Sequence, residues 1–189
     1  MAARWLDRQG VSRDTFAVAG RATVAIVIAA FLVPTAYGAE TSGLRPGDRV
    51  GSMRLARGTA ATADLKLFDI CNPIVLRSGS ETRRCGRVPR VRRLFIGYGS
   101  FDLPGKIDKL WTNTKWSSWI DGRPINLASF GSSDRTLGAF PPAGGKDVTL
   151  REWRVMLVGA VPGRHTLRYR SSGPDGKADT TWTFTVASK

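Results

Sequence analysis

The feature that most constrains the fold is a strict two-residue alternation near the C-terminus. In RHTLRYR, residues 164–170, apolar or aromatic side chains fall on every second position, and TTWTFTV, residues 180–186, repeats the pattern. Successive side chains of a β-strand point to opposite faces, so this period predicts two half-buried strands. The intervening SSGPDGKAD consists of turn-forming residues. The two segments therefore predict an antiparallel hairpin whose inward face carries His165, Leu167 and Tyr169.

Two further segments near the hairpin are read as strands. LREWRVMLVGAVPG, residues 150–163, predicts one strand with Trp153, Val155 and Leu157 on a single face, followed by a Pro-Gly turn. With the hairpin it predicts a meander of three sequential strands. In WSSWIDGRPINL, the Asp121–Gly122 pair is a strong two-residue turn signal and predicts a second hairpin.

The earlier part of the domain is less sharply patterned. DLKLFDI (64–70) and VRRLFIGY (91–98) are rich in β-branched and aromatic residues, which favours strands. GKIDKLWTNTKW (105–116) has Ile107, Leu110 and Trp111 at helical spacing, so a short helix and an irregular segment both stay open. Many short strands without βαβ alternation predict an antiparallel sandwich.

The last 30 residues of this pattern also carry a resemblance. The run VGAVPGRHTLRYRSSGPDGKADTTWTFTVA, residues 158–187, resembles the final strands of bacterial extracellular immunoglobulin-like domains. The expected fold class is therefore mainly β, an antiparallel immunoglobulin-like β-sandwich, with one short helix left open. We expect this domain to span 63–189. Residues 40–62, rich in Gly, Ser, Thr, Ala and Arg, read as a linker with one short edge strand near 50–55.

The N-terminus has the pattern of a targeting segment. Four arginines precede the apolar run ATVAIVIAAFLV, residues 22–33, and the small residues of Ala36–Tyr37–Gly38 follow it. We expect 1–39 to be a signal peptide and the mature protein to be secreted or extracytoplasmic. An uncleaved segment that anchors the chain to a membrane is the alternative, although the run is shorter than the ~20 residues that span a bilayer.

Cysteine content agrees with export. Cys71 and Cys85 are the only cysteines, and an even count in an exported chain predicts one disulfide that closes a short loop. Half of a metal site is the rival interpretation, but no histidine lies between them, and no metal or cofactor is expected.

The charge suggests an anionic partner. The chain has a formal charge of +14, and without residues 1–39 it keeps 25 basic and 13 acidic residues, which is +12. For an exported protein the expected partners are an anionic cell-wall polymer, an acidic polysaccharide or another envelope protein, and nucleic acid is not expected. Arginine makes up 22 of the 29 basic residues, a bias that codon usage also produces without any partner.

Two groups of residues are candidates for binding. A basic loop that the disulfide would fix carries most of the local charge, and arginine suits phosphate or carboxylate. Its members are Arg77, Arg83, Arg84, Arg87, Arg90, Arg92 and Arg93. Trp116 and Trp119 are candidates for stacking on a ligand, with core packing as the alternative. In a strand these two side chains point to opposite faces, whereas in a helix they share one.

The sequence contains few signals of catalysis. Whether the protein is an enzyme stays open, and a protein without catalytic activity is the preferred interpretation. His165 is the only histidine, and the alternation places it inward. The alternative to a binding module is a small extracellular hydrolase that uses aspartate carboxylates. Its candidates in loop-like regions are Asp102, Asp108, Asp121 and Asp134.

Overall fold

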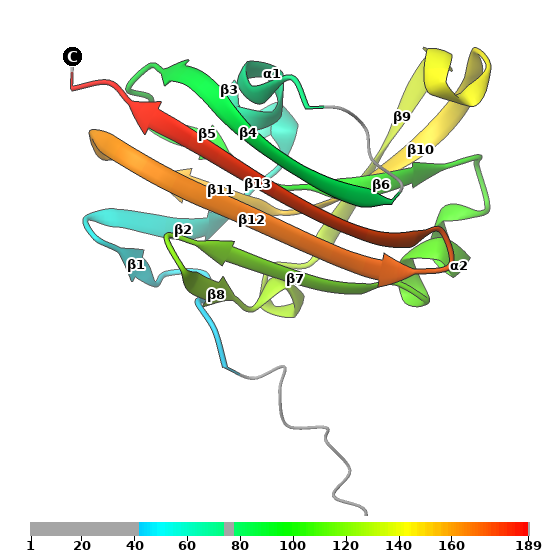
Figure 1. The fold of residues 1–189 in the computed structure, drawn as a ribbon, viewed down its shortest axis with the longest axis horizontal. Helices are drawn as coiled ribbons and strands as arrows, with labels where there is room; N and C mark the ends of the chain where they lie inside the picture. The colour runs from blue at the N-terminus through cyan, green and yellow to red at the C-terminus, as the bar shows by residue number, and fades with distance from the viewer. Residues whose placement is uncertain (1–41, 74–77, 189) are drawn as a thin grey trace, which may run out of the picture. The chain divides into compact units, whose positions relative to one another are not determined.

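The computed structural model describes residues 42–73 and 78–188, so the expected signal peptide and Arg77 lie outside the described residues. The described chain forms three sheets (Figure 1). The front sheet has the order β4 (Gly79–Val88), β13 (Gly176–Val186), β12 (Gly163–Gly173), β7 (Lys115–Ile120) and β8 (Arg123–Ile125). The back sheet has the order β1 (Arg49–Val50), β2 (Met53–Arg57), β11 (Val155–Val158), β5 (Arg93–Phe95) and β3 (Leu65–Lys66).

A third sheet, the arm sheet, has the order β6 (Gly99–Asp102), β10 (Lys146–Trp153) and β9 (Ser132–Phe140). The helical elements are short: α1 (Leu67–Cys71), α2 (Ile107–Thr112), and the 3-10 turns η1 (Ala60–Thr62), η2 (Leu127–Ser129) and η3 (Pro141–Ala143). Among the described residues, no helix has the length and apolar content needed to cross a membrane.

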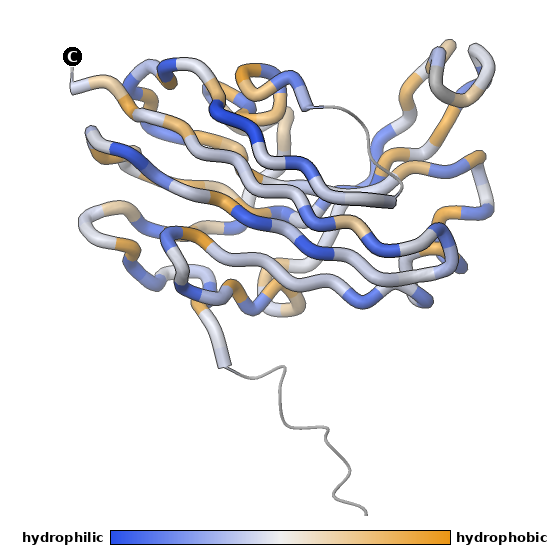
Figure 2. Tube along the Cα trace, viewed as in Figure 1, coloured by the Kyte–Doolittle hydropathy of each residue, from blue (hydrophilic) through white to orange (hydrophobic). Residues whose placement is uncertain are grey.

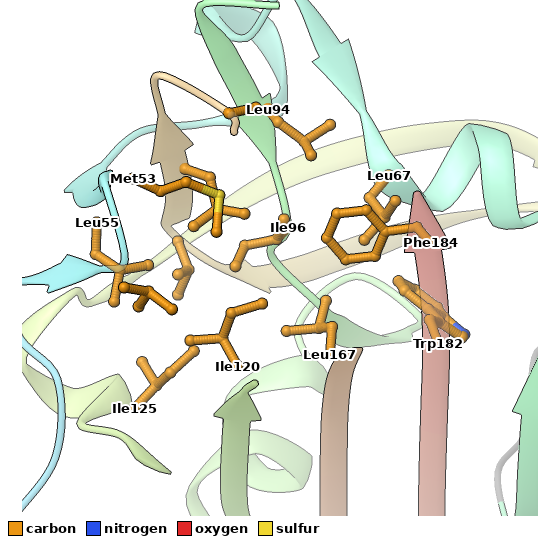
Figure 3. Packing of buried hydrophobic residues seen from close by; sticks show 14 of the residues in the cluster. Met53, Leu55, Leu67, Leu94, Ile96, Ile120, Ile125, Leu167, Trp182 and Phe184 are labelled. Carbon is orange, nitrogen blue, oxygen red and sulfur yellow. The ribbon is translucent and has the colours of Figure 1, made fainter. Parts of the chain in front are cut away.

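The front and back sheets share one hydrophobic core. Inward side chains of the back sheet, including Leu55 and Leu94, join the same buried cluster as Leu167 and Phe184 of the front sheet (Figure 3). The Tyr169 hydroxyl, which lies in this interior, donates a 2.8 Å hydrogen bond to the carbonyl of Ile96, just after β5. Most strand pairs are antiparallel. The expected mainly β fold, an antiparallel β-sandwich, is therefore confirmed, and its immunoglobulin-like character stays a prediction.

Three of the local predictions are confirmed. β12 and β13 form the expected hairpin, with Leu167 opposite Trp182 in its register and both side chains buried. β7 and β8 form the second hairpin, and Asp121 and Gly122 take positive φ values of 49° and 77°, as a two-residue turn of this kind requires. α2 confirms the short helix, with Ile107 and Leu110 buried.

Two strand predictions are wrong. Residues 150–163 do not form one strand: β10 ends at Trp153 in the arm sheet, and β11 begins at Val155 in the back sheet. The three-strand meander is absent as well, because β12 pairs with β7 and β13 rather than with β11. The apolar alternation continues across Arg154, so the change of sheet leaves no mark in the local pattern.

The expected strand at 64–70 is mostly helix. Only β3 is extended, and α1 follows it with Leu67 and Cys71 buried on one face at a spacing of four residues. The helix ends where Asn72 adopts a left-handed conformation, a common way to terminate a helix. A short apolar run fits both a strand and a single helical turn, so the burial pattern decides.

The expected linker belongs to the folded unit in its described part. β2 lies between β1 and β11, and Met53 and Leu55 are buried in the core. Leu44 is buried too, and its backbone exchanges hydrogen bonds with Pro124 and Asn126. The domain thus includes residues from 42 onwards instead of beginning near 63. The short edge strand expected near 50–55 is present as β1 and β2, but β2 is an interior strand of the back sheet rather than an edge strand.

Candidate functional site

The outward face of the front sheet is polar and basic. Along β12 and β13, every second residue points away from the core, and the register pairs Arg168 with Thr181 and Thr166 with Thr183. Arg164 lies opposite Thr185 in the same ladder, and both are exposed. Figure 2 shows hydrophilic segments along β12 and β4, the long strands seen in the front of Figure 1. This face is the solvent side of the predicted hairpin.

β4 adds two more arginines to this face. It pairs in parallel with β13, which places Arg84 beside Thr183 and Arg87 beside Thr185. Both arginine side chains are exposed. Paired residues in adjacent strands project to the same side, so Arg84 and Arg87 extend the basic surface to the edge of the sheet.

Trp119 lies within this surface on the other side of β12. The register pairs Trp119 with Arg168, and its chain neighbours Ser118 and Ile120 are buried, so the indole points outward. The guanidinium carbons of Arg168 and Arg170 lie 5.8 Å and 5.6 Å from the centre of the Trp119 ring. Guanidinium groups within about 6 Å of an indole are attracted to its electron-rich face.

Asp179 fixes the two arginines beside Trp119. Arg168 donates hydrogen bonds to both carboxylate oxygens of Asp179, at 2.8 Å and 2.5 Å, and Arg170 donates a third at 2.8 Å. These bonds, chiefly those from Arg168, lower the pKa of Asp179 to about 2. One carboxylate thus positions two guanidinium groups and leaves a net positive charge. We call Arg84, Arg87, Arg164, Arg168 and Arg170, together with Trp119, the basic face.

The predicted basic loop does not exist as a loop. Most of its described length is β4, and its arginines separate to different places in the fold. Only Arg84 and Arg87 join the basic face. Arg83 pairs with Glu81 at 2.9 Å and donates to the carbonyls of Cys71 and Asn72, while Arg93 binds Asp64. Arg90 and Arg92 are exposed in the turn that follows β4.

The predicted disulfide is present. Cys71 in α1 is bonded to Cys85 in β4, and their Cα atoms are 4.4 Å apart. The bond attaches the edge strand of the front sheet to the helix beside it. Cys85 faces inward, so its neighbour Arg84 faces outward, and the bond fixes the strand that carries part of the basic face.

Trp116 lies on the opposite side of the front sheet from Trp119, as the strand alternative predicted. Its ring packs against Trp111 of α2 at 5.0 Å and against Trp153 of β10 at 6.4 Å, measured between ring centres. Trp111 and Trp153 also contact each other, at 4.7 Å. The two predicted tryptophans therefore do not form a shared platform, and only Trp119 belongs to the basic face.

His165 and the aspartates occupy structural positions. The two ring nitrogens of His165 lie 2.8 Å from Asp121 Oδ2 and 3.0 Å from the carbonyl of Val161, and Asp121 also accepts from the Thr166 amide. Asp134 and Asp108 both bind Arg151, whose hydrogen bonds lower the pKa of Asp134. A general acid needs the opposite shift. Among the described residues, no group of three or more His, Cys, Asp or Glu is placed to hold a metal ion.

Comparisons with known proteins identify no family for this chain. No protein-family model and no curated protein matches the chain. The solved structure of PbICP-C in complex with falcipain-2 is 16% identical with a TM-score of 0.31, covering 61% of this chain and 95% of that one. The cysteine protease inhibitor EhICP2 from Entamoeba histolytica is 11% identical with a TM-score of 0.30, covering 66% and 98%. Likeness at this level carries no argument about partners.

Proposed function

We propose that this protein is an extracytoplasmic binding module whose basic face holds an acidic polysaccharide of the cell envelope. The observation that carries the proposal is the half-buried Trp119 beside the guanidinium groups of Arg168 and Arg170, on the outward side of the front sheet. An indole stacks on the apolar face of a sugar ring, and arginine donates paired hydrogen bonds to carboxylate.

Preorganisation supports this choice of surface. Asp179 already orients Arg168 and Arg170, so a ligand does not have to order those long side chains at full entropic cost. Arg84 and Arg87 extend the charge along the sheet, which suits an extended polymer better than a compact ligand. The disulfide between the only two cysteines supports an oxidising compartment.

The hydrolase alternative is not proposed. Asp121 and Asp134 are each held by basic or backbone donors, and Asp102 accepts from the amide of Leu103. Two carboxylates facing one cleft, one of them with a raised pKa, would favour glycoside hydrolysis. Asp108 and Asp134 share one partner, Arg151, but its hydrogen bonds lower the pKa of Asp134, whereas a general acid needs a raised pKa.

The first test compares two double variants of equal charge. Arg84→Ser with Arg87→Ser removes two guanidinium groups from the basic face. Arg49→Ser with Arg54→Ser removes two exposed groups from β1 and β2 of the back sheet, where they are paired in the register. On immobilised polygalacturonate at low ionic strength, we expect the first pair to weaken binding about tenfold, which is about 1.4 kcal/mol, and the second less than about twofold.

The second test separates a sugar ligand from other polyanions. Trp119→Ala is expected to weaken binding to polygalacturonate about fivefold but to change binding to linear polyphosphate less than about twofold, because only a sugar offers a face for stacking. Trp119 is half-buried, so urea unfolding has to show that the variant keeps its stability. In the first test, equal losses of affinity in both double variants would assign the binding to net charge alone. No loss of affinity in either would show that the high arginine content reflects composition and not binding.

A further inference from the structure

An apolar cleft of about 200 Å³ lies where the arm sheet meets the interior side of the front sheet. β9 and β10 run away from the front-sheet strands beside α2 (Figure 1). The cleft is bordered by α1, by the arm sheet, by the segment from α2 to β7 and by the turn between β12 and β13. Six aromatic side chains line it: Phe68, Phe95, Tyr98, Phe101, Trp116 and Phe140.

The arm sheet turns an apolar face toward this cleft. The register pairs Leu150 with Phe101 on one side and Val148 with Leu137 on the other, so these side chains project in a common direction. Leu137 and Leu150 are only half-buried and lie outside the shared core of the two large sheets. An apolar sheet face normally packs on another layer, and here it borders a cavity instead.

A buried carboxylate lies on the same face. Glu152 follows Leu150 by two residues in β10, and only 11% of its side chain is exposed. Arg135 Nε donates a 3.1 Å hydrogen bond to Glu152 Oε2 from a side chain that is itself 43% exposed. Oε1 makes no hydrogen bond with the described residues. An ionised carboxylate accepts hydrogen bonds through both oxygens, so Oε1 is available to a donor in the cleft.

The cleft lining is far less basic than the whole protein. Its lining contains three carboxylates, from Asp69, Glu152 and Asp175, and two cationic groups, from Lys66 and Arg135. The whole chain carries +14. Aromatic faces are negative as well, so walls of this composition attract a cation and disfavour an anion.

We propose that this cleft binds a small organic cation, an ammonium group on an apolar or aromatic body, with Glu152 as its counter-ion. The cavity volume of about 200 Å³ is far above the ~10–15 Å³ that a single water needs in the same measure. The ammonium group donates to Glu152 Oε1, and the body packs between Tyr98, Trp116 and Leu137. The site is separate from the basic face, and the two proposals stand or fall independently.

Three probes of similar shape and different charge test the ligand class. Phenethylamine is cationic, 2-phenylethanol is neutral and phenylacetate is anionic at neutral pH. Titration into the full chain is followed by nuclear magnetic resonance on the indole N–H signal of Trp116, which Trp116→Phe identifies. We expect phenethylamine to bind at least about tenfold more tightly than the alcohol, and phenylacetate to bind weakest. Equal affinities, preference for phenylacetate or no binding of the amine would overturn the proposal.

Three variants then locate the site. Glu152→Gln keeps the shape of the side chain and is expected to bring the amine to within about twofold of the alcohol. Asp69→Asn makes the same change of charge on the rim, where the carboxylate pairs with Lys66 and is 57% exposed, and should leave the preference unchanged. An equal loss in both variants would transfer the effect to the overall charge and remove the role of Glu152.

Leu137→Trp fills the cleft and should abolish binding of both the amine and the alcohol. Circular dichroism and the urea midpoint verify that each variant is folded. Undiminished binding to a folded Leu137→Trp protein would place the site elsewhere and overturn the proposal. As a cross-check, the Arg84→Ser and Arg87→Ser double variant should bind phenethylamine like the unaltered chain.

Discussion

The basic face and the apolar cleft are built on the two sides of the same strands. β7 sends Trp119 to the basic face and Trp116 to the cleft, and β12 sends Arg170 to one and Ser171 to the other. Neighbouring residues in a strand thus serve surfaces of opposite character. One is open, rich in arginine and ordered by Asp179, whereas the other is concave, aromatic and contains a buried carboxylate. A strand residue contributes to the basic face or to the cleft according to the side of the sheet to which its side chain points, and not according to its distance along the chain.

The largest expected effect comes from Trp182, because it supports both regions. Its ring is 1% exposed and makes edge contacts with Phe68 and Tyr98, which line the cleft, while its neighbours Thr181 and Thr183 lie on the outward side. Trp182→Ala removes a large core side chain and is expected to lower the free energy of unfolding by about 3–5 kcal/mol. Urea denaturation followed by circular dichroism measures this loss. A change below about 1 kcal/mol would contradict the packing described here.

The second largest expected effect on stability comes from the disulfide, which joins the two regions at one edge of the front sheet. Cys71 lies in the helix that carries Phe68 to the cleft, and Cys85 follows Arg84 of the basic face. Replacing both cysteines with alanine is expected to lower the free energy of unfolding by about 3 kcal/mol, because a loop of this length constrains the unfolded chain. Urea unfolding of the oxidised and the reduced native protein provides the control, and reduction should reproduce most of the loss. Identical midpoints would show that the bond contributes nothing.

The smallest expected effect on stability comes from Asp179, which belongs to the basic face and not to the cleft. Its pKa is lowered from 3.8 to about 2, so the folded state favours the ionised carboxylate. The resulting stability is present above pH 3.8 and is lost as the pH falls through about 2. Both arginines are partly exposed, and screening reduces the contribution to about 1 kcal/mol.

Asp179→Asn should therefore lower the free energy of unfolding at pH 6 and flatten its dependence on pH between those limits. Urea titrations at several pH values measure both quantities. Phenethylamine binding should be unaffected, because Asp179 lies outside the cleft lining. A variant with the unaltered pH dependence would show that Asp179 is not the group that titrates.

Sequence reasoning succeeded where the structural cause is local. The hairpin of β12 and β13 follows from period-two alternation around turn residues, and the second hairpin follows from Asp121–Gly122. The opposite directions of Trp116 and Trp119 follow from parity once the segment is a strand. The disulfide follows from the only pair of cysteines. Each prediction needs only near neighbours in the chain or simple counting.

The predictions from the sequence were wrong where the structure depends on pairing between segments that are far apart in the chain. β4 looked like a basic loop because exposed arginines alternate with half-buried residues, which is also how an edge strand appears. In the structure, Glu81, Arg83 and Cys85 are less exposed than the residues between them, as in a strand. Two of these three residues are charged, so hydropathy does not show the alternation.

What the sequence determined by itself is the β character of the chain, its C-terminal hairpin and the side to which each hairpin residue points, because period and turn chemistry are local. Only the tertiary structure decided that β4 runs parallel to β13 and brings Arg84 to the surface that holds Trp119. It also decided that β10 and β11 separate at Arg154, which opens the cleft beside Glu152. Both outcomes depend on pairing between segments far apart in the chain. Such pairing is selected by the burial and hydrogen bonding of the whole fold, and no single segment records it.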